Sequence, residues 1–213
     1  MSECYIFGGA KIENYSFIKI PNDAFIIAAD SGISHLKGFG VEPDIIMGDF
    51  DSCEFPTEYN CEIVRFKPEK DDTDLMIAVK KALSLGFDKI FILGATGGRF
   101  DHTIAALQTL EYIYEHGAFG AIFDENNAVY IQSVGKSRYK ADKNCYFSVL
   151  SLTDESVVSI SGTKYELQDS VIVRSFPLGV SNEFVKEYAE IELSKGKVLI
   201  IYSKRKFCNH FSD

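Results

Sequence analysis

Residues 89–115 read KIFILGATGGRFDHTIAALQTLEYIYE, and this stretch decides the fold class. Lys89–Leu93 is a short, continuous apolar run, which is typical of a strand buried on both faces of a sheet. A glycine-rich turn follows it, and Asp101–Glu115 then places apolar residues at helical spacing. A strand, a tight turn and a helix in this order predict one unit of a mostly parallel α/β sheet.

The same alternation runs back to the start of the chain. Thr73–Leu85 predicts a second amphipathic helix, with Leu75, Val79 and Ala82 near one face. Further buried strands are predicted at Cys4–Phe7, Phe25–Ala29, Ile45–Met47, Ile63–Phe66 and Ala121–Phe123. We therefore expect an N-terminal, mostly parallel α/β sandwich domain over residues 1–126.

The pattern changes after residue 126, where short apolar runs follow one another closely between Gly, Ser, Asp and Asn. The runs are Val129–Gln132, Tyr146–Leu152, Ser156–Ser161, Lys164–Leu167, Val171–Val173, Glu190–Leu193 and Val198–Tyr202. Glu183–Tyr188 alone hints at a helical turn. This texture predicts a C-terminal antiparallel β-sandwich domain over residues 127–213, with a core thin enough to benefit from dimerisation.

Composition and charge narrow the class of protein. The chain has 46% hydrophobic residues and no apolar run long enough to span a bilayer, and it opens on a strand. Five cysteines, an odd number without C-x-x-C spacing, argue against a disulfide framework or a thiolate zinc site. We expect a cytoplasmic protein with no membrane partner.

The net charge of −9 is carried by residues 1–138, which hold 21 acidic and 12 basic side chains. An acidic surface argues against nucleic acid as a partner, because phosphate backbones bind basic faces. Carboxylates that hold a metal ion fit such a surface, although solubility alone also accounts for it.

Polar clusters follow three of the predicted strands. Asp30, Ser31 and Gly32 come after one, Gly48–Ser52 after the next, and Gly94–His102 after Lys89–Leu93. Ligands of open α/β sheets bind beyond the carboxyl ends of the strands. The three clusters therefore predict a single site at that edge.

Four aspartates in these clusters predict a metal site. Asp71 and Asp74 lie three residues apart at the start of the predicted helix, and Asp49 and Asp51 follow a strand. Four carboxylates with few cations nearby repel one another unless a divalent ion neutralises them, and hard oxygen ligands select Mg²⁺. Since Mg²⁺ also prefers phosphate ligands, a nucleotide fits; helix capping explains any one of these residues taken alone.

The turn containing Gly97 and Gly98 offers backbone N–H groups to phosphates at the start of a helix. It matches neither the dinucleotide-binding fingerprint nor a P-loop. Arg99 suits a transferring phosphoryl group, and His102 suits either a phosphate or the helix cap.

Taken together, these motifs resemble the thiamine pyrophosphokinase family. The resemblance rests on Ala29–Gly32, Pro43-Asp44, Gly48–Ser52, Lys70–Asp74 and Gly97–His102, and in the second part on Gly162–Leu167, Gly179–Glu183 and Val198–Tyr202. It covers nearly the whole chain. It implies transfer of the diphosphate of ATP to the hydroxyl of thiamine, an N-terminal domain for ATP and Mg²⁺, a C-terminal domain for thiamine, and a homodimer with thiamine at the subunit interface.

The resemblance also implies residue roles. The candidates for binding Mg²⁺ and for activating the thiamine hydroxyl are Asp49, Asp51, Asp71, Asp74 and Asp101. The residues that would bind the nucleotide are Asp30, Ser31, Gly32, Thr73, Gly97, Gly98, Arg99 and His102. Catalysis itself is assigned to Asp71, Asp74, Asp51 and Arg99. Tyr165 would stack on the pyrimidine ring of thiamine, and Ser181 and Asn182 would hydrogen-bond thiamine or order its pocket. Two departures are Ala106, where bacterial relatives often have Asn, and Tyr165, where some have Trp.

Two other functions remain open at this point. Asp49-Phe50-Asp51 has the D-x-D form of a Mg²⁺-dependent phosphohydrolase, but it follows about the third strand and Cys53 stands where that class has Thr or Val. A non-catalytic module that senses a nucleotide or thiamine would use the same folds, although binding alone does not need so many carboxylates.

Overall fold

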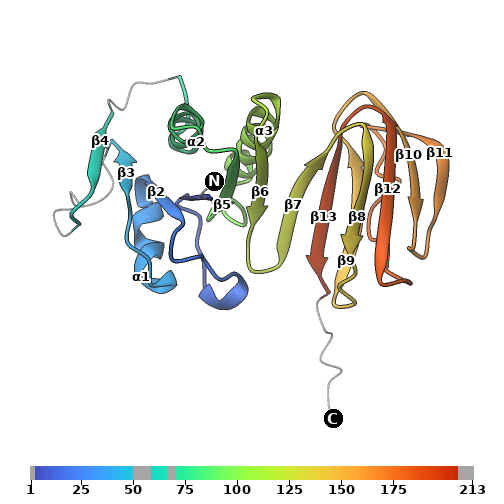
Figure 1. Ribbon diagram of the computed structural model, residues 1–213, viewed down its shortest axis with the longest axis horizontal. Helices are drawn as coiled ribbons and strands as arrows, with labels where there is room; N and C mark the ends of the chain where they lie inside the picture. The colour runs from blue at the N-terminus through green and yellow to red at the C-terminus, as the bar shows by residue number, and fades with distance from the viewer. Residues whose placement is uncertain (1–2, 50–58, 67–70, 206–213) are drawn as a thin grey trace, which may run out of the picture. The chain divides into compact units, whose positions relative to one another are not determined.

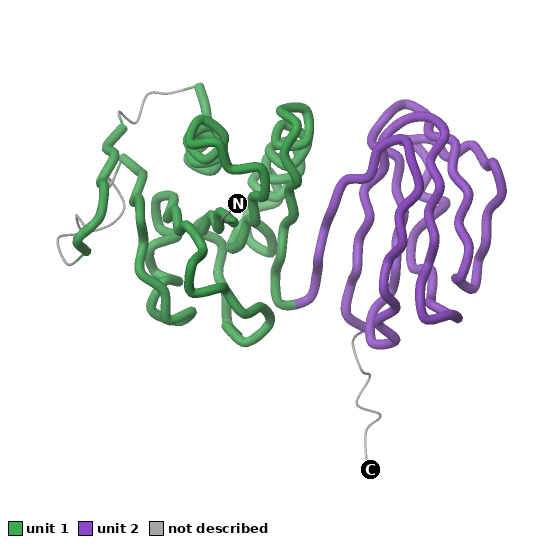
Figure 2. The backbone as a smooth tube through the Cα atoms, viewed as in Figure 1, with its two compact units in different colours: residues 1–125 green, residues 126–213 purple. Residues whose placement is uncertain are grey.

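A computed structural model describes residues 3–49, 59–66 and 71–205. The chain divides into two compact units, Met1–Glu125 and Asn126–Asp213 (Figure 2). Each unit has its own hydrophobic core. The predicted division of ATP and thiamine binding between the two parts stays a prediction.

The first unit is built on a parallel sheet with strand order β4-β3-β2-β1-β5-β6. Its strands are β1 (Cys4–Phe7), β2 (Phe25–Ala29), β3 (Ile45–Gly48), β4 (Glu62–Arg65), β5 (Lys89–Leu93) and β6 (Phe119–Phe123). The prediction of a mostly parallel α/β sheet is confirmed. All six strands were expected, with ends shifted by at most two residues.

The strand order reverses at β1, which pairs with β2 on one side and with β5 on the other. The chain moves outward through β2, β3 and β4, then returns to add β5 and β6 on the far side of β1. The chain therefore passes from β1 to strands on one side of the sheet and from β5 to β6 on the other side. This is the switch point at which open α/β sheets bind their ligands.

Helices cover both faces of this sheet (Figure 1). The helices α2 (Asp74–Ser84) and α3 (Phe100–Glu115) lie on one face, as Figure 1 shows, and bury Ala78, Val79 and Leu110. The other face packs against the short helices η1 (Tyr15–Phe17), η2 (Asp30–His35) and α1 (Leu36–Phe39). The short helices were not expected, because segments of three to six residues are too short to show apolar periodicity.

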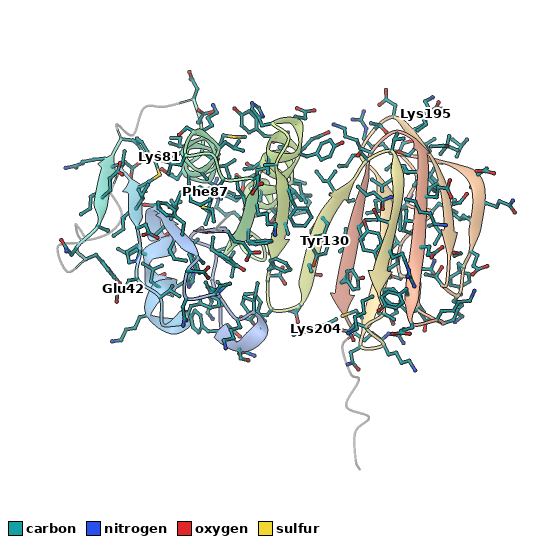
Figure 3. All side chains as sticks on the ribbon, in the orientation of Figure 1. Glu42, Lys81, Phe87, Tyr130, Lys195 and Lys204 are labelled. Atoms are coloured by element: carbon teal, nitrogen blue, oxygen red, sulfur yellow. The ribbon has the colours of Figure 1, made fainter. Side chains whose placement is uncertain are left out.

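The second unit is an antiparallel β-sandwich. One group of strands is ordered β7-β13-β9, the other β11-β10-β12-β8. The bounds are β7 (Asn127–Gln132), β8 (Gly135–Lys140), β9 (Cys145–Ser151), β10 (Glu155–Ser161), β11 (Leu167–Val173), β12 (Tyr188–Lys195) and β13 (Val198–Lys204). Phe147 is fully buried in the core between them, and Tyr130, labelled in Figure 3, meets the ring of Tyr202 edge-on. The predicted sandwich is confirmed.

Three details of this unit differ from the sequence-based expectation. β8 was missed because Gly135–Lys140 is a mostly exposed edge strand without an apolar run. Lys164–Leu167 is not a strand: only its last residue begins β11. Glu183–Tyr188 contains no helical turn. The N–H groups of Val185 and Lys186 donate hydrogen bonds to Gly162 O, in a distant segment, and not to carbonyls of their own segment.

No helix in the described part of the chain is long and apolar enough to cross a membrane. Cys4, Cys61 and Cys145 are free thiols, and burial raises the pKa of the Cys145 thiol to about 11 and that of Cys4 to about 12. Such thiols are poor nucleophiles at neutral pH.

Candidate functional site

A cavity of about 600 Å³ opens in the first unit at the carboxyl edge of the parallel sheet. It lies where the strand order reverses, and the loops after β1, β2, β3 and β5 and the starts of α2 and α3 form its walls. The lining residues are Gly8, Gly9, Ala10, Lys11, Ala29, Asp30, Ser31, Asp49, Asp72, Thr73, Asp74, Leu75, Gly94, Ala95, Gly98, Arg99, His102 and Ala105. The polar clusters that follow the strands thus meet at one site.

The loops after β1 and β5 touch each other through their backbones. Gly8 N donates to Leu93 O and Ala10 N donates to Gly94 O, both at 2.8 Å. Gly94 has φ +64°, and a Cβ atom there would lie 2.4 Å from Gly8 O. Glycine is therefore required at position 94, because any side chain would push the two loops of the cavity apart.

Asp30 stands out at the end of β2. Its φ of +48° lies in the left-handed region, which non-glycine residues occupy at a cost. Its Oδ1 atom is buried and has no hydrogen-bond partner among the described residues. A buried acceptor without a partner is costly in a folded protein, so this oxygen is suited to a ligand group in the cavity that the residue lines.

The start of α2 forms a second wall. Thr73 is the N-cap, and its Oγ1 accepts a hydrogen bond of 3.2 Å from Met76 N. The hydroxyl hydrogen stays available for a ligand oxygen. Asp72 pairs with Lys80 at 2.7 Å, Asp74 occupies the first helical turn, and both residues line the cavity.

The start of α3 forms a third wall, with Arg99 as the N-cap residue. Arg99 bonds Asp101 through two nitrogens, at 2.6 and 3.2 Å, and Asp101 also accepts from His102 N. The hydrogen bond from Arg99 holds the pKa of Asp101 below its usual value. Because this ion pair is exposed, a phosphate entering the cavity can replace Asp101 on the guanidinium.

Oxygen donors of the cavity suit a hard cation. Asp30, Asp49, Asp72 and Asp74 line it, and none of the described cysteines does. The buried, unpartnered oxygen of Asp30 is the donor that most needs a cation or a hydrogen-bond donor. Within the described ranges no three such side chains approach closely enough to hold a metal, and Asp51 lies outside those ranges. The donor chemistry fits Mg²⁺.

His35 does not line the cavity but contacts the backbone of Ala10, which does. Its side chain is buried, its Nε2 lies 2.9 Å from Ala10 O, and its Nδ1 lies 3.3 Å from the Tyr15 hydroxyl. Burial lowers the pKa of His35, and the hydrogen bond to Ala10 partly offsets this. We assign the neutral form with its proton on Nε2, which donates to the Ala10 carbonyl.

The three residues predicted to bind the second substrate lie in the other unit. Asn182 is buried, and its Oδ1 accepts from Tyr165 N at 3.0 Å and Glu183 N at 2.9 Å. Its Nδ2 donates to Thr163 Oγ1 at 3.1 Å and Tyr165 O at 2.7 Å. All of these partners belong to the fold, so Asn182 orders the Tyr165 segment.

Tyr165 itself is available to a ligand, because 61% of its surface is exposed. Lys164 Nζ lies 5.5 Å from the centre of its ring, and Lys164 also pairs with Glu183 at 3.1 Å. Ser181 is exposed at φ +60°, and its N–H donates to Ser148 Oγ. An aromatic face held by a buried amide can stack on a planar ring.

The structure brings half of the predicted residues to one cavity. Those that line it are Asp30, Ser31, Asp49, Thr73, Asp74, Gly98, Arg99 and His102. Gly32, Gly97, Asp71 and Asp101 belong to the same loops but are not in the lining, and Tyr165, Ser181 and Asn182 lie in the second unit. The roles given to all of these residues stay predictions.

Sequence reasoning missed the loop Gly8–Lys11 and the lining residue Asp72. The signal for the loop was present, because Gly8-Gly9 directly follows a buried strand. Gly32 has no room for a side chain, because a Cβ atom there would lie 2.0 Å from Phe7 O at the end of β1.

Comparison with known proteins finds relatives that match both parts of the chain. Two family models match the chain: "Thiamin pyrophosphokinase, catalytic domain" over residues 19–119 and "Thiamin pyrophosphokinase, vitamin B1 binding domain" over residues 136–198. The thiamine pyrophosphokinase of Bacillus subtilis is 29% identical over 184 residues, which span 83% of this chain and 86% of that protein. Thiamin pyrophosphokinase 1 of Caenorhabditis elegans is 27% identical over 188 residues, 82% of this chain and 77% of that protein.

Solved structures agree with the sequence matches. The crystal structure of thiamine pyrophosphokinase from Bacillus subtilis has a TM-score of 0.86 at 25% identity and covers 97% of this chain and 100% of that one. A thiamin pyrophosphokinase family protein from Enterococcus faecalis also has a TM-score of 0.86, at 26% identity, over 96% of this chain and 100% of that one. Both units of the chain are therefore shared with these proteins.

Proposed function

The chain belongs to the thiamine pyrophosphokinase family, and we propose that it transfers the diphosphate of ATP to the hydroxyl of thiamine. The products are thiamine diphosphate and AMP. The cavity of the first unit takes ATP, and the Tyr165 face of the second unit takes thiamine.

One observation carries the nucleotide part of this proposal: two helix N-termini and two glycine-rich loops converge on one cavity. The N-terminus of a helix carries partial positive charge and unpaired N–H groups, so it attracts phosphate oxygens. Lys11 and Arg99 add two full positive charges to the lining. A triphosphate is the ligand that uses all of these groups together.

Mg²⁺ would be held by Asp49 and Asp74 in the cavity, with Asp51, Asp71 and Asp101 as further candidates. When bound, the ion neutralises phosphate charge next to the aspartates. The chain's own residues bind and orient the nucleotide: Thr73, Gly97, Gly98 and His102 on the phosphates, and Asp30, Ser31 and Gly32 at the end of β2.

In the reaction, the thiamine oxygen forms a bond to the β-phosphorus of ATP. The bond from that phosphorus to the α–β bridging oxygen breaks, and AMP leaves with this oxygen. Asp74, with Asp71 as the other candidate, accepts the proton that the hydroxyl loses. Arg99 can leave Asp101 and follow the charge on the transferring group, so catalysis consists of positioning and charge neutralisation.

Thiamine carries a positive thiazolium ring and a planar pyrimidine. The exposed ring of Tyr165 suits stacking on the pyrimidine, and the buried Asn182 holds that segment in place. Ser181, exposed beside Asn182, is a hydrogen-bond donor for the substrate.

We further propose that the enzyme is a cytoplasmic homodimer with thiamine at the subunit interface. Large apolar side chains stay exposed in both units, among them Phe100 at 79%, Phe176 at 62% and Val185 at 61%. A second copy of the chain would remove such surface from water. The three described cysteines are free thiols, in agreement with a reducing compartment.

The first experiment incubates the purified protein with Mg²⁺, ATP and thiamine and separates the products by chromatography. Thiamine diphosphate and AMP in equal amounts, both lost on addition of EDTA, are the expected result. ADP with thiamine monophosphate would contradict attack at the β-phosphorus. Release of inorganic phosphate without a thiamine product would favour a phosphohydrolase, and saturable thiamine binding without turnover would favour a sensing module.

A further inference from the structure

Two carboxylates outside the cavity are bonded to two of the loops that line it. Asp124 and Glu125 directly follow β6, which pairs with β5 in the parallel sheet. Both side chains are half-buried, and neither belongs to the cavity lining. Nothing in the proposed reaction uses either residue.

Asp124 is bonded to the turn after β5. Its Oδ2 accepts a hydrogen bond of 2.5 Å from Thr96 Oγ1. Thr96 lies inside the glycine-rich turn, between Ala95 and Gly97, and Ala95 lines the cavity. A hydroxyl that donates to a carboxylate forms a short, charge-assisted bond, so this contact restrains a turn that glycines would otherwise leave pliable.

Glu125 is bonded to the loop after β1. Its Oε1 accepts hydrogen bonds from Glu13 N and from Asn14 N, the latter at 2.8 Å. These residues follow Lys11, which lines the cavity and pairs with Glu13 at 2.5 Å. One carboxylate oxygen thus fixes the backbone just beyond the lysine.

We propose that Asp124 and Glu125 are positioning residues of the nucleotide site. They hold the turn after β5 and the loop after β1 in their binding geometry before ATP arrives. ATP then binds without ordering these loops, and this lowers the entropic cost of binding. This inference rests on the proposed function, since it takes the cavity as the ATP site.

The test uses substitutions on the loop side and on the carboxylate side, each with a matched control. Thr96→Val removes the hydroxyl at nearly constant volume, and Thr96→Ser keeps it. Glu125→Ala removes the acceptor for two N–H groups, and Glu125→Gln keeps an acceptor oxygen without the charge. ATP binding is measured by calorimetry without thiamine, and KM for ATP and for thiamine by steady-state turnover.

Thr96→Val and Glu125→Ala are expected to weaken ATP binding and raise its KM by about three- to tenfold, the scale of one or two lost hydrogen bonds. The KM for thiamine stays within about twofold of the wild-type value, and both control variants bind ATP like the wild type. In combination with Asp124→Ala, Thr96→Val has no additional effect, because both changes remove the same bond.

Unchanged ATP affinity in Thr96→Val and Glu125→Ala would overturn the inference. So would an equal rise in both KM values, or unfolding of Thr96→Val, because either would indicate a general structural role. A wild-type protein that binds ATP but makes no thiamine diphosphate would refute the proposed function alone, since the calorimetric comparison does not depend on turnover.

Discussion

Asp72 and Asp74 are two carboxylates at the start of α2, and both line the cavity. Asp72 is already paired with Lys80 at 2.7 Å. Asp74→Asn should lower kcat at least about tenfold, because it removes the carboxylate proposed to accept the proton and to bind Mg²⁺. Asp72→Asn should change kcat by less than about threefold, because an exposed ion pair contributes little. Steady-state turnover at saturating ATP and thiamine measures both.

Equal losses in the two variants would remove the distinction between these aspartates. Circular dichroism serves as the control, because an acidic residue in the first turn also stabilises the helix by up to about 1 kcal/mol. A kcat loss in Asp74→Asn without a loss of helix content would be a chemical effect.

His35 makes a second residue-scale prediction, on pH. Because burial lowers its pKa in the folded state below the unfolded value of about 6.5, the folded protein binds fewer protons at this site. Its contribution to stability is therefore complete above the unfolded pKa and is lost as the pH falls through the folded pKa. Thermal melting between about pH 7.5 and pH 5.5 should show the wild-type Tm falling more than that of His35→Gln.

The glutamine of His35→Gln keeps an N–H for the Ala10 carbonyl but does not titrate. The difference between the two melting curves isolates this one group from other residues that titrate in the same range. If Tm falls equally with pH in the two proteins, protonation of His35 does not change the free energy of unfolding, and the prediction is wrong.

At the scale of single residues, the sequence predicted best those site residues whose polar side chain stands directly after a strand or at the start of a helix. Asp30, Thr73 and Arg99 follow strands or begin helices and were expected at the cavity that they line. Asp124 and Glu125 were not, because their role depends on hydrogen bonds to Thr96 and to the backbone of residues 13 and 14. Contacts between residues so far apart in the chain leave no local pattern.

At the scale of elements, buried strands were predictable and edge strands were not. β5 is a continuous apolar run and was expected with its observed ends, Lys89–Leu93. β8 alternates exposed charged residues with half-buried ones, and its partner β12 alone makes it a strand. The segment between β10 and β11 was expected to be a strand but bonds instead to Asn182 and Glu183. Tertiary partners therefore decided these elements over local propensity.

Asn182 connects two such irregular segments, which leads to an element-scale prediction. Asn182→Leu leaves the N–H groups of Tyr165 and Glu183 without their acceptor and should lower the free energy of unfolding by about 2–4 kcal/mol. Because the Tyr165 segment loses its anchor, the KM for thiamine should rise at least about tenfold with the KM for ATP unchanged. Chemical denaturation and steady-state kinetics measure the two effects.

Thr163→Val is the matched control, because it removes one acceptor of the Asn182 amide and leaves both N–H groups bonded. It should cost at most about 1 kcal/mol of stability. An Asn182→Leu protein that stays stable, or that loses affinity for ATP rather than thiamine, would contradict the role given to this residue.

At the scale of the whole molecule, the two proposed substrates are assigned to different units with separate cores. All described residues that line the proposed ATP cavity belong to the first unit, and Tyr165 and Asn182 belong to the second. Transfer requires the two substrates to meet. The proposed homodimer meets this requirement by pairing the first unit of one subunit with the second unit of the other.

This arrangement predicts complementation between two inactive variants. Asp74→Asn disables the first unit and Tyr165→Ala the second. If each site combines units from two subunits, a mixed dimer has one site with both wild-type residues and one site with neither. Random exchange makes half of the dimers mixed, so co-expression of the two variants should restore about a quarter of wild-type turnover. Turnover no higher than the average of the two separate variants would mean that each site is complete within one subunit. Sedimentation of the same samples verifies that dimers are present, and therefore either outcome decides where thiamine binds.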